Sequence, residues 1–155
     1  MKSLITLLLT TLVAGALYAA TPLPYKIVID REGPEEAAFE KITASLVEAK
    51  VDKALANAAL KGFDRYIDKR IDGGKTVTLY PQTIFEVTRT AAAKGWPAAD
   101  TGNLLIHLQT EIDDEGASGT KLKRGAVAEI EKGKKLREVI DTLEKNEGAD
   151  DDDDR

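Results

Sequence analysis

The stretch AAAKGW at residues 91–96 has the features of a helix ending. Alanine favours helix, lysine suits the negative end of the helix dipole, and glycine permits the left-handed backbone that closes many helices. An aromatic residue directly after the glycine can fold back onto the last turn. Because Pro97 can start a new helix at once, the sequence predicts a sharp reversal between two antiparallel helices.

Two weaker copies of this pattern occur, at residues 58–63 and 130–133. Together, Gly62, Gly95 and Gly133 predict helix ends at a spacing of about 35 residues, the length of many helix-pair repeats. The spacing resembles that of tetratricopeptide arrays, but the signature residues of that repeat are missing, so neither its fold nor its peptide binding is carried over. Lys-Gly is also a common way to end a helix. The pattern therefore predicts an architecture and no activity.

The composition is typical of one globular domain with an aliphatic core. The chain has 155 residues, of which 43% are hydrophobic, 32% charged and only 5% aromatic. The net charge of −5 argues against general affinity for nucleic acid, which depends on neutralising phosphates with Lys and Arg. The chain has no cysteine, which excludes disulfides, thiol nucleophiles and thiolate metal sites.

Residues 1–20 have the three parts of a secretory signal peptide. Lys2 supplies the positive start, a short apolar run follows, and small residues end the segment. Cleavage is expected after Ala16 or Ala19. The apolar run is shorter than the ~20 residues that span a bilayer, although an uncleaved anchor stays open. We therefore expect an exported protein without a stable membrane span after cleavage.

Residues 21–33 are predicted to be an extended leader or a short strand. Residues 25–30 are rich in β-branched side chains, and residues 76–80 are their expected partner in a two-stranded ribbon. Such a ribbon is marginal alone and needs helices beneath it.

Residues 34–145 are predicted to form a mainly α domain. Apolar residues at helical spacing indicate about five or six short amphipathic helices, in a bundle or an array of helical hairpins. Residues 34–72 fit either one long helix or two helices that meet near Gly62; a glycine costs ~1 kcal/mol inside a helix, which favours the break. Residues 146–155, which include five consecutive aspartates, are predicted to be a disordered acidic tail.

Several short motifs match parts of known sites, and each match is incomplete. Residues 72–76 end like a phosphate-binding loop but lack its first glycine and lie between a helix and a strand. Asp100-Thr101-Gly102 matches the aspartic-protease triplet but lies in a predicted helix and has no second copy. Residues 111–122 fit a calcium loop until its last position, where Leu122 replaces the expected glutamate.

His107 is the only histidine, so a zinc site would need carboxylates to complete it. General-base catalysis by His107 with Glu111, one helical turn later, is an alternative to a plain helix-edge histidine. The segment 121–137 is rich in Lys and Arg, and we interpret it as the solvated sides of two helices rather than a site for anionic partners.

We expect an exported, non-enzymatic helical domain that binds a protein or peptide partner. Phe63 and Trp96 are the candidate partner contacts, since each aromatic directly follows a predicted helix end. A cap contact is the simpler role for both. The alternatives are a small hydrolytic enzyme that uses His107 and carboxylates, and a carrier of an apolar small ligand. No catalytic, cofactor-binding or metal-binding residue is assigned, and no nucleic-acid partner is expected.

Overall fold

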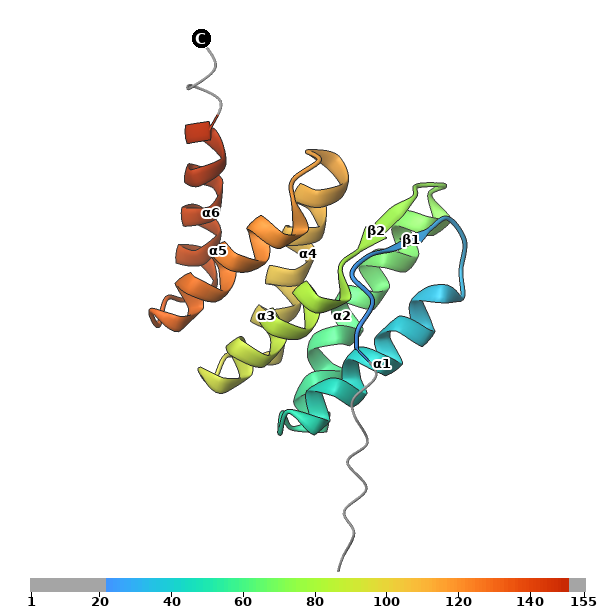
Figure 1. Ribbon diagram of the computed structural model, residues 1–155, viewed down its shortest axis with the longest axis horizontal. Coiled ribbons are helices and arrows are strands. Elements are labelled where there is room, and N and C mark those ends of the chain that lie inside the picture. The colour runs from blue at the N-terminus through green and yellow to red at the C-terminus, as the bar shows by residue number, and fades with distance from the viewer. Residues whose placement is uncertain (1–21, 151–155) are drawn as a thin grey trace, which may run out of the picture.

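Six helices and two short strands follow one another along residues 22–150, the part of the chain that the computed structural model describes (Figure 1). The fold is mainly α, as the sequence predicts. In chain order the elements are β1 (Ile27–Ile29), α1 (Pro34–Glu48), α2 (Lys53–Asp72), β2 (Val77–Leu79), α3 (Pro81–Ala93), α4 (Ala98–Asp114), α5 (Gly119–Glu131) and α6 (Leu136–Asp150).

The predicted ribbon is confirmed over three residues of each strand. β1 and β2 are antiparallel, and Val28 lies opposite Thr78 at their centre. The outer edge of β2 is closed by α4: Thr78 N–H donates to Asp113 Oδ1 (3.2 Å), and Gln109 Nε2 donates to the Thr78 carbonyl (2.9 Å). The helices therefore support the ribbon, as a sheet of this size requires.

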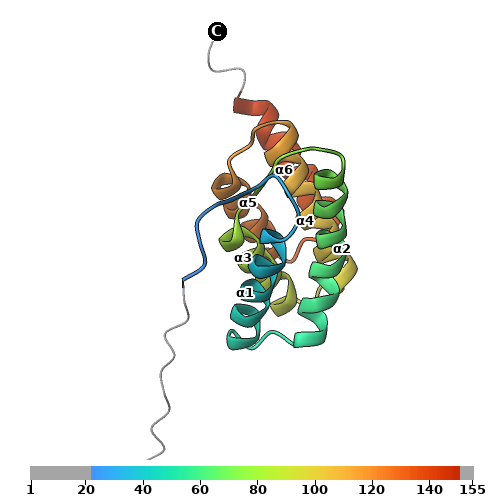
Figure 2. The ribbon, with the colours of Figure 1, turned by 90° about the vertical axis from the view of Figure 1, so that its right-hand side faces the viewer.

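The helices pair into hairpins that stack side by side: α1 with α2, α3 with α4, and α5 with α6 (Figure 1). The odd-numbered helices pack on one another in one layer and the even-numbered helices in a second, on the left and right of Figure 2. The most extensive contacts are between α2 and α4 and between α3 and α5. Of the two predicted arrangements, the array of helical hairpins is the one observed.

The helix ending predicted at Lys94 and Gly95 is confirmed. Gly95 N–H donates to the Ala92 carbonyl (3.0 Å), and Trp96 N–H donates to the Ala91 carbonyl (2.9 Å). This pattern of two bonds needs a left-handed residue, and Gly95 has φ 72°. Trp96 then enters the core with 8% of its surface exposed. Local hydrogen bonds and one buried aromatic ring therefore fix the reversal into α4.

The predicted helix break near Gly62 is wrong, because Gly62 lies inside α2. The break occurs earlier: Lys50 adopts a left-handed conformation (φ 67°), and Asp52 caps α2 by accepting a hydrogen bond from Leu55 N–H (2.9 Å). Gly62 costs α2 about 1 kcal/mol, less than the ~2 kcal/mol or more that burying a side chain such as Phe63 contributes. Tertiary packing therefore overrides the glycine signal.

The three hairpin turns thus lie at Lys50, Gly95 and Gly133, and all three residues have positive φ. Gly133 follows α5, where the sequence predicts a helix end. The first turn uses lysine in place of glycine. Two of the three turns therefore follow the Lys-Gly pattern, and the first does not.

The predictions for the two ends of the chain lie wholly or partly outside the described residues. Helix α6 continues to Asp150 and so occupies the start of the segment 146–155, which the sequence predicts to be a disordered tail. Residues 151–155 lie outside the described residues, as does the predicted signal peptide at 1–20 with its cleavage positions.

Candidate functional site

The two aromatic residues predicted as partner contacts are both in the core. Phe63 is 1% exposed and packs edge-on against Phe39, with ring centroids 5.8 Å apart. Trp96 is 8% exposed. Neither side chain presents an area that a partner could cover, so we assign both to the fold and place the candidate site elsewhere.

His107 lies half-buried on α4, with a buried Nε2 that has no hydrogen-bond partner in the described chain. Glu111 is one turn further along the same helix and forms no hydrogen bond or ion pair with it there. Among the described residues, no serine or threonine hydroxyl forms a hydrogen bond with His107 Nε2. The geometry gives the enzyme alternative no assembled acid–base pair.

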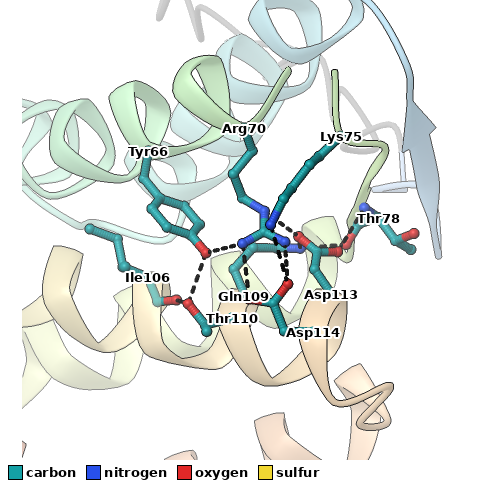
Figure 3. Close-up of polar contacts among 9 residues, drawn as sticks. All are labelled: Tyr66, Arg70, Lys75, Thr78, Ile106, Gln109, Thr110, Asp113 and Asp114. Carbon is teal, nitrogen blue, oxygen red and sulfur yellow. Dashed lines mark hydrogen bonds and ion pairs between the residues drawn. The ribbon is translucent and has the colours of Figure 1, made fainter. Parts of the chain in front are cut away.

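Asp113 and Asp114, the aspartates of the calcium-like motif, interact with the side chain of Arg70 (Figure 3). Arg70 of α2 donates to both carboxylate oxygens of Asp114 (2.6 and 3.1 Å), and its Nε lies 3.6 Å from Asp113. Arg70 also donates to the Tyr66 hydroxyl (2.9 Å). The Tyr66 hydroxyl in turn donates to Thr110 (2.8 Å), because the Thr110 hydroxyl proton is engaged with a backbone carbonyl.

This polar network ties α2, α4 and β2 together, and its electrostatics are those of a satisfied ion pair. The hydrogen bond from Arg70 lowers the pKa of Asp114, and the same bond raises the pKa of Arg70. Within the described residues, no group of three or more His, Cys, Asp or Glu side chains is arranged to hold a metal ion. We therefore assign the network to the fold.

The other two motifs also have structural roles. Residues 72–76 form the turn between α2 and β2, in the helix-then-strand order that does not suit a phosphate loop. Asp100-Thr101-Gly102 lies in α4, where Gly102 faces the α2 backbone: a Cβ built on Gly102 would lie 2.8 Å from the Ala59 carbonyl oxygen. Gly102 thus permits a close approach of α2 to α4.

An open groove of about 860 Å³ lies between α1 and α2. Its walls are one continuous stripe of each helix, since the lining positions recur every three or four residues. On α1 they run from Glu36 to Glu48, and on α2 from Lys53 to Asp64. At 1.5 Å rise per residue, the groove is about 17 Å long, or three helical turns.

The groove has an apolar floor. Phe39 and Leu60 form its base and belong to the core, with 8% and 4% of their surfaces exposed. Val47 stands on the α1 wall with 41% of its surface exposed, and it is one of three large hydrophobic side chains exposed in the described chain. Ala44, one turn before it, is also exposed. The apolar surface that is open to solvent is thus that of Val47 and Ala44 on the α1 wall, above a buried floor.

The rim of the groove is acidic. Four carboxylates line it against two lysines, Lys53 and Lys61; the carboxylates are those of Glu36, Glu40, Glu48 and Asp64. Burial raises the pKa of Asp64, and the neighbouring charges of Asp68, Glu35 and Glu36 raise it further. The groove consequently combines an exposed apolar wall on α1 and a buried apolar floor with an excess of negative charge.

The sequence analysis does not find this groove. Val47 directly follows the buried Leu46, and the structure places it one position outside the core stripe of α1. One sequence signal that indicates this site is the spacing of Asp64 and Asp68, since like charges four residues apart on a helix repel each other. A second was Glu36 and Glu40, which have the same spacing on α1.

Comparison with models of protein families, with curated proteins and with solved structures found no match. No helix of the described chain is long and apolar enough to span a membrane. The groove and the charges around it are therefore the features that bear on function.

Proposed function

We propose that this protein is an exported, non-enzymatic helical domain that binds a helical segment of a protein partner in the groove between α1 and α2. The observation that carries the proposal is the exposed apolar wall of that groove, where Val47 and Ala44 stand above the buried side chains of Phe39 and Leu60. A surface of this kind, framed by polar residues, is typical of a protein-interaction site.

The shape of the groove favours a helix as its occupant. Each hairpin of the array packs laterally against the next, and the groove is lined only by α1 and α2 of the first hairpin. A partner helix in the groove extends that packing by one element, in the way that amphipathic helices dock into grooves of other proteins. The groove accommodates about three turns, so a segment of about 12 residues fits it.

Export rests on residues 1–20, whose positive start, apolar run and small residues are those of a secretory signal. The carrier alternative lacks support from the core, where the pocket beside Phe63 and Leu108 has a volume of only about 10 Å³, about one water molecule. The enzyme alternative lacks an acid–base pair at His107, as described above.

A peptide selection tests the proposal without knowledge of the natural partner. Random 16-residue peptides displayed on phage are selected on the purified protein, and the enriched peptides are synthesised and their Kd measured by fluorescence anisotropy. Val47→Arg places a charge on the groove wall and should weaken binding at least tenfold. Val28→Arg is the matched control: Val28 is also an exposed valine (57%) but lies on β1, outside the groove.

The proposal predicts peptides with an apolar helical face and a loss of affinity confined to Val47→Arg. Equal affinity for the two valine variants, or no enrichment over a display on the Val47→Arg protein, contradicts it. Circular dichroism of both variants should match the wild type, because both valines are exposed.

A further inference from the structure

The acidic end of the α1–α2 groove continues along α2 beyond the groove itself. Asp64 lines the groove, and Asp68 and Asp72 follow it at four-residue steps on the same side of the helix. We call Asp64, Asp68 and Asp72 the acidic strip. Its length is about 12 Å at 1.5 Å per residue. Three carboxylates at this spacing repel one another and lower the stability of the helix.

The start of α1 adds further carboxylates to the same region. The pKa of Glu32 is raised by a hydrogen bond and by repulsion from Asp72, and then by the charges of Asp68 and Glu35. Glu35 and Glu36 act in the same direction on Asp64. Among the described residues, none of these carboxylates forms an ion pair with a lysine or arginine. The region is therefore an uncompensated concentration of negative charge.

Glu35 provides an independent sign that a positive group is missing. Its side chain is buried, with only 3% of its surface exposed. Oε1 accepts a hydrogen bond from Gly33 N–H (2.7 Å), whereas Oε2 is buried without any hydrogen-bond donor in the described chain. A buried carboxylate oxygen without a donor destabilises the folded protein, and a cation at this corner would offset that cost.

We infer that the acidic strip and the corner at Glu35 bind lysine or arginine side chains of the segment that occupies the groove. This inference rests on the proposed function and defines the partner: a segment whose apolar face fills the groove and whose next turns carry two or three basic residues. Charge complementarity of this kind sets the partner's register and speeds its association.

A basic partner also explains why these carboxylates lie together, although their repulsion lowers the stability of the free protein. Charges that oppose folding but are kept together commonly belong to functional sites. The carboxylates are spread along the helix in a line, and no metal-binding group is formed among the described residues. A row of basic side chains on an elongated partner matches that line.

The test uses the peptides selected on the wild-type protein and compares their affinities for two double variants. Asp64→Asn with Asp68→Asn removes two charges from the strip. Asp141→Asn with Glu144→Gln removes two charges from exposed positions of α6 and serves as the control. The inference predicts selected peptides enriched in Lys and Arg at one end. It also predicts a Kd about tenfold or more weaker for the strip variant only.

Two further readouts separate binding from stability. Raising NaCl from about 50 to 500 mM should weaken peptide binding to the wild type more than to the strip variant, because fewer charges remain to be screened. The strip variant should unfold at the wild-type temperature or above it, because repulsion has been removed.

Peptides without excess basic residues, or an affinity for the strip variant within twofold of the wild type, overturn the inference. If such peptides still lose affinity for Val47→Arg, the proposed function stands and only the identity of the partner is wrong. If Val47→Arg has no effect either, the groove is not the binding site.

Discussion

Replacing Gly102 by alanine should destabilise the protein, whereas the same change at Gly62 should stabilise it. The two glycines lie on α4 and α2, the pair of helices with the most extensive contact. A Cβ on Gly102 would be 2.8 Å from the backbone oxygen of Ala59, closer than real Cβ atoms come. A Cβ on Gly62 meets nothing within 4 Å.

The magnitudes follow from the geometry. The contact at Gly102 must lengthen by about 0.6 Å, from 2.8 to 3.4 Å, before it is an ordinary one, and backbone atoms can move only if α2 and α4 separate. Such overpacking costs about 1–3 kcal/mol. Alanine gains about 1 kcal/mol over glycine inside a helix. Gly62→Ala should therefore gain about 1 kcal/mol, and Gly102→Ala should lose up to about 2 kcal/mol.

Urea unfolding followed by circular dichroism measures both changes. The free energies of unfolding of the two variants should differ by about 1–3 kcal/mol, and 1 kcal/mol corresponds to about 3–5 °C in Tm for a domain of this size. Equal stability of Gly102→Ala and Gly62→Ala would refute the close approach of α4 to α2. A loss of stability in Gly62→Ala would refute the continuity of α2 through residue 62.

The remaining predictions concern the turns, the core and the polar network. Lys50→Gly should raise Tm by an amount equivalent to about 1 kcal/mol, since a left-handed lysine is strained (φ 67°); an unchanged or lower Tm contradicts this account. Trp96→Ala should cost about 3–5 kcal/mol in urea unfolding because the ring is 8% exposed, and a wild-type midpoint would place the ring outside the core. Asp113→Ala should cost about 1–3 kcal/mol because it leaves the Thr78 N–H without its acceptor and removes a buried charge beside Arg70, and Asp114→Ala should cost less because Asp114 is exposed; the reverse order in chemical denaturation would be evidence against the network. The hydrogen bond from Arg70 lowers the pKa of Asp114 in the folded state. This pair therefore stabilises the protein fully above about pH 4, and the stabilisation is lost as the pH falls through the lowered pKa. Tm should fall less steeply in acid for Asp114→Asn than for the wild type, and identical acid profiles would exclude the effect.

The sequence was sufficient for the helical class, the ribbon and the turn at Gly95, because each has a local chemical signal. Glycine after lysine marks a left-handed helix end, and two β-rich segments flank the first helices. The turn at Lys50 has no such signal, since lysine is rarely left-handed. Its position is set instead by Asp52, which caps α2, and by the packing of that helix on α4.

The candidate site could not be predicted from local sequence patterns, for a different reason. Phe63 and Trp96 are predicted as partner contacts because each directly follows a predicted helix end, but the packing of the helices buries both side chains in the core. Val47 and Leu46 are neighbouring apolar residues that point in different directions around α1. A step of one residue along a helix decides whether a side chain packs in the core or lines the groove. The groove depends on how α1 lies against α2, which no single segment of sequence specifies.

Hydrogen–deuterium exchange of the protein with and without a selected peptide tests the central claim most directly. If the peptide occupies the groove, the amides that gain protection should lie in residues 36–48 of α1 and 53–64 of α2, and the extra protection should be absent in Val47→Arg. Protection centred on α3 to α6, or protection that survives Val47→Arg unchanged, would contradict the account.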